Sequence, residues 1–204
     1  MVRMKVKITT TEDMLGTAPA DATLYETYIG QNAPDALSLE EEVAAIGEEA
    51  VLVNKMTIFP RNEEGNPIVW DYQWKGMFKD ACGMLRRVPG TESSKMKAYK
   101  KIIDGLIFVE NRKIQIVTDK EVTICQRPIR AATPQGERVA LAASEAIAAG
   151  ATMEFTIMCI VDSDEKAVVE WLNYGKLRGF GQWRNSGMGR FEWELIERTQ
   201  EAFA

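Results

Sequence analysis

The sequence predicts an α+β fold in which helices cover one face of an antiparallel sheet. Apolar residues alternate with polar ones near both ends of the chain, which is the period of half-buried strands. Two internal segments repeat apolar residues at helical spacing, and the second lies between two strand patterns. A strand, helix, loop and strand unit of this kind suits a two-layer sandwich. With 204 residues, 46% of them hydrophobic, the chain has enough apolar surface for one buried core.

The first element is a strand predicted over residues 1–10. Four apolar residues alternate there with three basic ones: Val2, Met4, Val6 and Ile8 with Arg3, Lys5 and Lys7. One face of this strand is therefore expected to be buried and the other to be basic. Residues 15–36 contain two glycines and two prolines, so this segment is predicted to be largely loop.

A short helix and two strands follow. Ser38 begins the helix as the first residue of a Ser-Leu-Glu-Glu capping box, and Gly47 ends it. Strands are predicted over residues 52–59 and 67–71, separated by a turn at residues 62–66 that contains two asparagines and a glycine.

The helix predicted over residues 73–87 has two different faces. Its buried stripe consists of apolar residues at helical spacing: Trp74, Met77, Phe78, Ala81 and Leu85. Lys75, Lys79 and Arg86 lie within about one eighth of a turn of each other on another face, given the rotation of an α-helix. The polar residues 89–97 that follow are predicted to form a mobile loop.

Three short strands are predicted next, over residues 106–109, 113–118 and 122–129, with a turn-rich connection at residues 134–136. The last fifty residues begin with a strand over residues 153–161. Asp162 and Glu165 are predicted to cap a helix that Gly175 ends. This helix buries Val168, Trp171 and Leu172, and alternating residues from Phe191 to Leu195 predict the closing strand.

The composition excludes several kinds of chemistry. The chain contains no histidine, so Ser-His-Asp and Cys-His nucleophiles, a histidine base and mixed Cys/His zinc sites are excluded. Cys82, Cys125 and Cys159 form no CxxC pair and fit a reduced, cytoplasmic-type interior. No apolar run has the length of a membrane span, and residues 1–10 alternate instead of forming a signal-type block. We expect a cytoplasmic protein without a membrane partner.

The net charge of −5 conceals a polarised distribution. Residues 1–50 hold 3 basic and 10 acidic residues, a net of −7, whereas residues 75–113 hold 10 basic and 4 acidic residues, a net of +6. Residues 176–190 hold four basic residues and no acidic one. Local basic tracts of this kind can form a phosphate-binding face even on an acidic protein.

A glycine-rich segment lies between the last helix and the last strand. Gly179, Gly181, Gly187 and Gly189 allow positive φ angles and close approach of the backbone to a ligand. Arg178, Arg184 and Arg190 are interleaved with them and can bind phosphates. The segment is not a P-loop, because no Gly-Lys-Ser/Thr follows, and it is not a dinucleotide fingerprint, because the glycines lead into a strand and not into a helix. Two interpretations stay open: a binding loop, or a long connection whose Trp183 and Phe180 pack into the core.

Three motifs resemble those of the RAMP superfamily, which comprises RNA-binding subunits of CRISPR effector complexes and their processing-nuclease relatives. The glycine-rich loop at residues 179–190 resembles the C-terminal motif of the family. The Gln-Trp-Lys-Gly-Met-Phe-Lys segment at residues 73–79 is similar to the Ser-Leu-Lys-Gly-x-x-Arg helix entrance of backbone subunits. The first strand with Met-Leu-Gly at residues 14–16 is similar to the strand and Leu-x-Ile-Gly loop that open such proteins.

The resemblance implies a modified ferredoxin-like (RRM-like) antiparallel sheet with helices on one face and an inserted β-rich and loop region. It implies a single domain over residues 1–204, with insertions at about 16–50 and 88–140 and the best match at 151–197. The implied function is that of a CRISPR-associated RNA-binding subunit. Because processing nucleases of the family often use histidine and the chain has none, we expect a non-catalytic member. We also expect no cofactor and no metal.

On this interpretation the partners are single-stranded, guide-like RNA, CRISPR effector subunits, or both, and copies of the chain can assemble side by side. We expect the basic helix and the glycine-rich loop to contact RNA phosphates. The expected contact residues are Lys75, Lys79, Arg86, Arg87, Arg178, Gly179, Gly181, Arg184, Gly187, Gly189 and Arg190.

Two alternatives stay open. The acidic N-terminal part suits a phage- or prophage-encoded mimic of a CRISPR backbone subunit, which acts as an inhibitor through protein contacts. A metal-dependent RNase is the other alternative, with Asp21 as its candidate catalytic residue. The acidic neighbours of Asp21, which include Asp13, Glu26 and Asp35, fit no motif with defined spacing.

Overall fold

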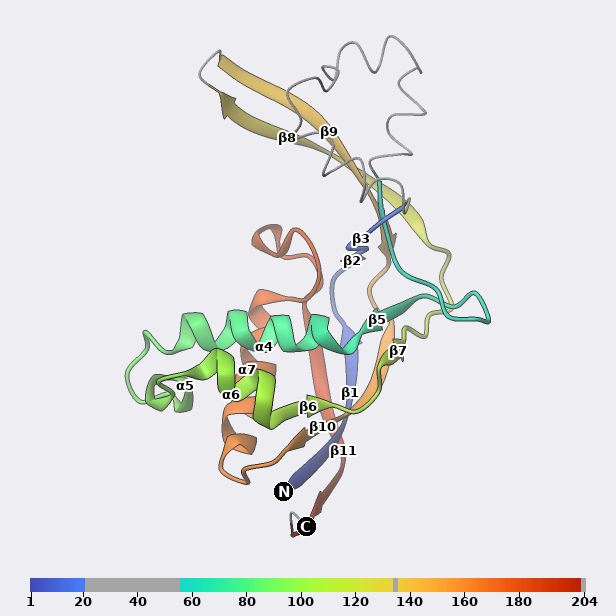
Figure 1. Cartoon of the computed structure of the whole chain (residues 1–204). Helices are drawn as coiled ribbons and strands as arrows, with labels where there is room; N and C mark the ends of the chain where they lie inside the picture. Colours follow the sequence, from blue (N-terminus) through green and yellow to red (C-terminus); the bar gives the residue numbers. More distant parts are fainter. Residues whose placement is uncertain (21–55, 134–135, 203–204) are drawn as a thin grey trace, which may run out of the picture. The chain divides into compact units, whose positions relative to one another are not determined.

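The computed structural model describes residues 1–20, 56–133 and 136–202, and the chain divides into two compact units (Figure 1). The first, which we call the sheet unit, comprises Met1–Met14, Pro60–Glu121 and Ile147–Ala204. The second, the hairpin unit, comprises Leu15–Phe59 and Val122–Ala146. A single domain over residues 1–204 stays a prediction.

The sheet unit is built on a four-stranded antiparallel sheet. Its strands lie in the order β11 (Phe191–Gln200), β1 (Val2–Thr10), β10 (Thr152–Cys159) and β6 (Ile107–Val109). Helix α4 (Asp71–Leu85) lies between β1 and β6 in the chain, and α7 (Asp164–Arg178) joins β10 to β11. This order, fourth, first, third and second along the chain, is that of a ferredoxin-like βαββαβ sandwich. The predicted α+β, ferredoxin-like fold is confirmed.

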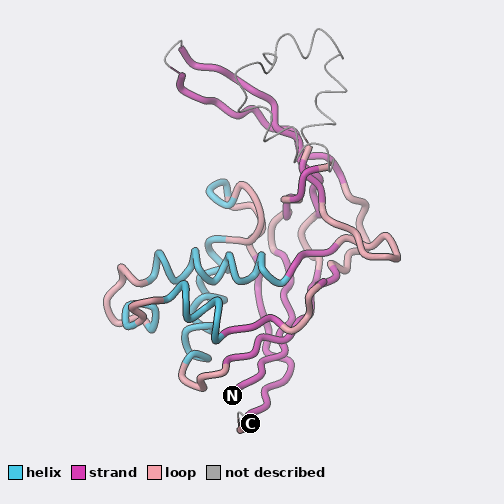
Figure 2. The backbone as a smooth tube through the Cα atoms, viewed as in Figure 1, coloured by secondary structure: helices cyan, strands magenta, loops and turns pink. Residues whose placement is uncertain are grey.

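The core of the sheet unit lies between the sheet and the long helices, which form a layer on one face of it (Figures 1 and 2). The apolar face of β1 is at most 1% exposed at Val2, Met4, Val6 and Ile8. From α4, Trp74 contacts Phe155 of β10 and Phe191 of β11, with ring centroids 4.6 and 5.6 Å apart. Phe78 packs on Trp171 of α7, with centroids 5.7 Å apart. Aromatic residues thus join α4 both to the sheet and to α7.

Helix α4 begins and ends two residues before its predicted bounds. The backbone N–H of Trp70 donates to Oε1 of Gln73 at 2.7 Å, which satisfies one polar group at the start of the helix. The predicted buried stripe is confirmed at four of its positions, with Leu85 only half-buried. Cys82, which the pattern did not assign to the core, is buried instead.

Helix α7 buries the predicted Val168, Trp171 and Leu172, but the prediction that Gly175 ends it is wrong. The helix continues to Arg178, and Gly179 follows it with a φ of 80°. Gly175 is needed for packing, because a Cβ at this position would lie 2.2 Å from Cζ of Phe191. The close contact between α7 and β11 therefore explains this glycine.

The acidic residues that were predicted to cap α7 instead contact residues near the two ends of the chain. Asp162 forms an ion pair with the N-terminal amine of Met1 at 2.6 Å and accepts a hydrogen bond from Gln200 at 2.7 Å. Glu165 accepts two hydrogen bonds from the guanidinium of Arg198 on β11, at 2.7 and 2.8 Å. Both carboxylates therefore attach the start of α7 to β11, and Asp162 also attaches it to the N-terminal residue.

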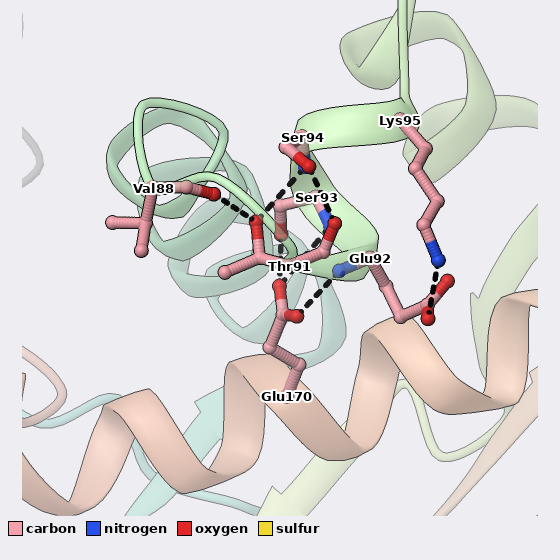
Figure 3. A network of polar contacts seen from close by, with 7 residues as sticks. All are labelled: Val88, Thr91, Glu92, Ser93, Ser94, Lys95 and Glu170. Atoms are coloured by element: carbon pink, nitrogen blue, oxygen red, sulfur yellow. Dashed lines mark hydrogen bonds and ion pairs between the residues drawn. The ribbon is translucent and has the colours of Figure 1, made fainter.

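The prediction of a mobile loop at residues 89–97 is wrong, because the segment contains helix α5 (Glu92–Lys95). The Thr91 hydroxyl accepts from the backbone N–H of Ser94, and the Glu170 carboxylate of α7 accepts from the backbone N–H groups of Glu92 and Ser93 at 2.7 and 3.1 Å (Figure 3). The Ser93 hydroxyl also donates to Glu170 at 2.5 Å. These contacts order a polar segment through a partner 77 residues away, which no local pattern reveals.

One further helix and a pair of strands complete the sheet unit. Helix α6 (Tyr99–Leu106), which was not predicted, precedes β6. Strand β5 (Ile68–Trp70) pairs with β7 (Lys113–Gln115), in agreement with the strands predicted there. The turn at residues 62–66 is confirmed, since the Asn62 side chain accepts from the backbone N–H groups of Glu64 and Asn66.

In the described part of the hairpin unit, the longest elements are the antiparallel strands β8 (Thr123–Thr133) and β9 (Gly136–Ile147). The short strands β2 (Met14–Leu15), β3 (Ala18–Pro19) and β4 (Thr57–Ile58) join the same sheet. No element was predicted for the alanine-rich β9, whose pairing with β8 overrides its weak strand propensity. The predicted helix at residues 38–47 and most of the loop at residues 15–36 lie outside the described residues.

Candidate nucleic-acid interface

The glycine-rich loop joins α7 to β11 within the sheet unit. Gly179, Gly181, Gly187 and Gly189 have φ angles of 80, 85, 88 and 69°, so the predicted need for positive φ is confirmed. A Cβ on Gly189 would lie 1.9 Å from the carbonyl oxygen of Phe180, and one on Gly179 would lie 2.3 Å from that of Met188. The backbone N–H of Phe180 donates to Gly189 at 2.8 Å. The glycines therefore let the two arms of the loop approach each other closely.

The two aromatic residues of the loop have different environments. Phe180 is 4% exposed and stacks on Trp74 of the core, with ring centroids 4.4 Å apart and ring planes 23° apart. Trp183 is 41% exposed and adopts a left-handed backbone conformation with a φ of 53°. It precedes a short 3₁₀ helix, Arg184–Ser186. The interpretation that the aromatic residues of the loop pack into the core thus holds for Phe180. It does not hold for Trp183, which lies at the surface.

Arg178 and Arg184 converge on one carboxylate of α4. Nε of Arg178 and Nη1 of Arg184 donate to the same Oδ2 atom of Asp80, at 3.3 and 2.8 Å. Arg178 also donates to Asn185 of the loop. The three charged side chains are 24–27% exposed, so they remain accessible to a ligand. Two guanidinium groups that share one carboxylate leave a net positive charge.

A pocket of about 300 Å³ lies at this arginine pair. Its lining residues all belong to the end of α7 and the loop: Arg178, Gly181, Gln182, Trp183, Arg184 and Asn185. The pocket therefore combines guanidinium groups and amide side chains with an exposed indole. Groups of this kind bind phosphates and stack on bases of single-stranded nucleic acid.

The third arginine of the loop, Arg190, is exposed, and its Nε donates to the carbonyl oxygen of Leu177 at 3.0 Å. This carbonyl belongs to the last turn of α7, where a cation interacts favourably with the helix dipole. Arg190 therefore contributes to the end of the helix as well as to the charge of the loop.

The basic face predicted on α4 exists, but α6 covers part of it. Nζ of Lys79 forms an ion pair with Asp104 at 2.5 Å, and Nζ of Lys75 donates to the carbonyl oxygen of the same residue at 3.0 Å. Burial lowers the pKa of Lys75, against the opposing effect of Asp104. The guanidinium of Arg86 lies over the Tyr99 ring at 5.2 Å. Arg87, which follows α4, is exposed. Phosphate contact by these residues stays a prediction.

Asp80 is a member of the candidate site that the sequence did not predict. It follows Lys79 in a segment whose charge is mostly basic, and it joins α4 to the glycine-rich loop through Arg178 and Arg184. A lone acidic residue in a basic helix was the available signal, but the sequence alone does not say which arginines it contacts.

The metal-dependent RNase alternative gains no support from the described residues. Asp21 lies outside the described residues. In the described part of the chain, no group of three or more Asp, Glu or Cys side chains could hold a metal ion. Burial raises the pKa of both Cys82 and Cys159, the latter to about 12, so these two thiols are neutral near pH 7. Among the helices that the structure describes, none is long and apolar enough to cross a membrane.

The fold is similar to that of solved structures. No protein-family model matches the sequence, and no curated protein matches it significantly. A chain of the cryo-EM structure of the type III-B Cmr-beta bound to cognate target RNA aligns with a TM-score of 0.53 and 14% identity, over 97% of this chain and 60% of that chain. A chain of a type IV-B CRISPR complex aligns with a TM-score of 0.48 and 11% identity, over 99% and 92% of the two chains. This chain thus spans about 60% of the length of the first of these chains.

Proposed function

We propose that the protein is a non-catalytic, CRISPR-associated subunit of RAMP type that binds single-stranded RNA through its glycine-rich loop and helix α4. The observation that carries this proposal is the pair Arg178 and Arg184, which share Asp80 beside a pocket that Trp183 also lines. The fold similarity to a chain from an RNA-bound structure agrees with it.

The arginine pair gives this proposal a mechanism. A guanidinium has five N–H donors, and Asp80 occupies one donor on each arginine. Asn185 occupies a second donor on Arg178, and the other donors can bind phosphate oxygens while Asp80 keeps the two side chains in one orientation. Holding the side chains in place reduces the conformational entropy lost on binding. Bases next to the bound phosphates then stack on Trp183.

Salt dependence of binding tests this mechanism. Four phosphate contacts on single-stranded RNA give a slope of about −2.8 in a plot of log affinity against log salt, since each contact contributes about −0.7. A fourfold rise in salt then weakens binding about 50-fold. Fluorescence anisotropy with a labelled RNA of mixed sequence measures both quantities. Arg184→Ala should make the slope less steep by about 0.7.

Arg198→Ala is the matched control, because it also removes a guanidinium that is paired with a carboxylate, in this case Glu165 in the first turn of α7. We expect its slope to equal that of the wild type. Binding that is independent of salt, or no binding to any RNA of mixed sequence, would show that the proposal is wrong.

A protein partner is the second candidate, favoured by the edge strand β11. Leu195 and Ile196 on this strand are 46 and 47% exposed, and Glu194 and Glu197 beside them are exposed too. Such a strip suits a neighbouring subunit, a second copy of the chain, or the complex that a mimic would inhibit. Recovery of effector subunits from a nuclease-treated lysate supports this candidate, and recovery of RNA alone contradicts it.

A further inference from the structure

Two aromatic residues, one exposed and one half-buried, lie at the start of α4, separate from the glycine-rich loop. Trp70 precedes the helix and Tyr72 belongs to its first turn. Their rings are nearly parallel, with planes 12° apart and centroids 6.4 Å apart. Tyr72 is 54% exposed and Trp70 is half-buried, whereas Trp74 in the next turn is fully buried. The pair therefore lies at the edge of the core and offers aromatic surface to water.

Arg112 completes this group from the connection between β6 and β7. Its guanidinium carbon lies 5.7 Å from the ring centroid of Trp70 and 5.8 Å from that of Tyr72. Its Nη1 atom donates to both carboxylate oxygens of Asp71, at 2.7 and 3.0 Å. The side chain of Arg112 is nevertheless 68% exposed. One carboxylate thus holds a planar cation against two aromatic rings without removing it from water.

The backbone fixes the same arrangement. The backbone N–H of Asp71 donates to the carbonyl oxygen of Arg112 at 3.2 Å. Trp70 pairs with Lys113 in the antiparallel ladder of β5 and β7. The segments that carry the rings and the cation are therefore tied at two adjacent positions. A rigid arrangement of this kind loses little conformational freedom when a ligand binds.

The position of Tyr72 on α4 relates this group to the basic face. With a rotation of about 100° per residue, Tyr72, Lys79 and Arg86 lie within about 40° of one another around the helix axis. The rise of about 1.5 Å per residue separates Tyr72 from Arg86 by about 21 Å. Stacked nucleotides rise by about 3.4 Å, so this length corresponds to about six of them. The aromatic group thus lies at one end of the basic face.

We propose that Trp70, Tyr72 and Arg112 form a stacking platform for an unpaired base of single-stranded RNA. The base stacks on the exposed ring of Tyr72, and the guanidinium plane of Arg112 beside the two rings extends the stacking surface. Aromatic rings combined with arginine are the usual means by which proteins bind unpaired bases. This inference rests on the proposed RNA-binding function, and it adds a second site with a preference for bases over the bare backbone.

Comparison of two oligomers separates the platform from the phosphate contacts. One is a labelled 12-nucleotide single-stranded RNA of mixed sequence, and the other is an abasic ribose-phosphate oligomer of the same length and label. Stacking on one aromatic group changes affinity by about 5- to 150-fold. Tyr72→Ala should therefore weaken binding of the RNA by a factor in this range and leave the abasic oligomer within twofold of the wild type.

Matched variants distinguish stacking from charge and from folding. Tyr72→Phe retains the ring and should bind both oligomers as the wild type does. Arg112→Lys retains the charge but not the planar cation, and it should weaken RNA binding selectively. Arg184→Ala should weaken both oligomers by the same factor, because its proposed contacts are to phosphates. Thermal unfolding of Tyr72→Ala and Tyr72→Phe shows that the comparison is made on folded protein.

The outcomes separate this inference from the proposed function. If the wild type binds RNA but Tyr72→Ala and Arg112→Lys affect the two oligomers equally or not at all, the platform is overturned and the RNA-binding function stands. If the wild type binds neither oligomer, both proposals are overturned. A selective loss of RNA binding in both variants supports the platform.

Discussion

At the scale of single residues, Asp80 controls the charge that the glycine-rich loop presents. It accepts hydrogen bonds from Arg178 and Arg184 through one oxygen, so it orients both guanidinium groups and partly neutralises them. These two effects oppose each other for a phosphate ligand, because orientation favours binding and neutralisation disfavours it. The balance depends on the strength of the ion pairs, which lie near the surface and are weakened by water.

We predict that Asp80→Asn increases affinity for single-stranded RNA about twofold to fivefold at low salt. Asparagine keeps one acceptor oxygen for the arginines, while the competing charge is lost, and an ion pair this accessible is worth about 0.2–1 kcal/mol. Anisotropy titrations at 50 mM salt measure the change. Glu110→Gln removes the same charge next to Arg3 and serves as the control. Equal affinities of the two variants would contradict the prediction.

At the scale of elements, the packing of α7 on β11 depends on a glycine in the middle of a helix. Gly175 lies against the Phe191 ring so closely that any Cβ would overlap it. Glycine lowers the stability of a helix interior by about 1 kcal/mol relative to alanine. The close packing of Phe191 on the helix offsets this cost. It also places the start of β11, and so the end of the glycine-rich loop, directly against α7.

We predict that Gly175→Ala lowers the free energy of unfolding by about 1–3 kcal/mol, because the methyl group forces α7 and β11 apart. Gly76→Ala in α4 is the matched control. No atom lies within 4 Å of the added Cβ there, so the gain in helix propensity should raise stability by about 0.5–1 kcal/mol. Urea unfolding of the two variants measures both. A stabilising Gly175→Ala would contradict the packing argument.

At the scale of the whole molecule, charged groups from distant parts of the sequence hold the two chain ends beside each other. The Met1 amine pairs with Asp162 and donates to the carbonyl oxygen of Glu201, while Arg3 pairs with the Glu201 side chain. Glu165 is joined to Arg198 nearby. Hydrogen bonds from Arg198 lower the pKa of Glu165, and those from the N-terminal amine lower the pKa of Asp162.

These shifts predict that stability decreases in acid. A carboxyl group whose pKa is lower in the folded state stabilises the fold above its ordinary value, and this contribution is lost as the pH falls through the folded pKa. Glu165→Gln should therefore be less stable than the wild type at pH 7, and this difference should shrink as the pH falls below the ordinary value of 4.5. Urea unfolding at pH 7 and pH 3 checks this. A stability difference that does not change with pH would contradict it.

The sequence predicts the parts of this molecule whose signals are periodic and local. β1, β10, α4 and α7 were found because their apolar residues face one core at a regular spacing. The same signals do not predict α5, because its order depends on the distant Glu170. They do not predict β9 either, because its structure depends on pairing with β8. For the candidate site, the arginines and glycines could be named in advance. Their common partner Asp80 could not, since it comes from another element.

One tryptophan has a consequence for how variants of this protein are selected. Trp183 has the positive φ that glycine adopts without strain, and it is the one non-glycine residue with such a φ within residues 1–20, 56–133 and 136–202. A screen for heat resistance would favour glycine at this position, because the backbone would relax. The same screen would discard the indole that we propose for binding RNA bases. Thermostability and RNA affinity should therefore be selected together, or the variants recovered will be robust and inactive.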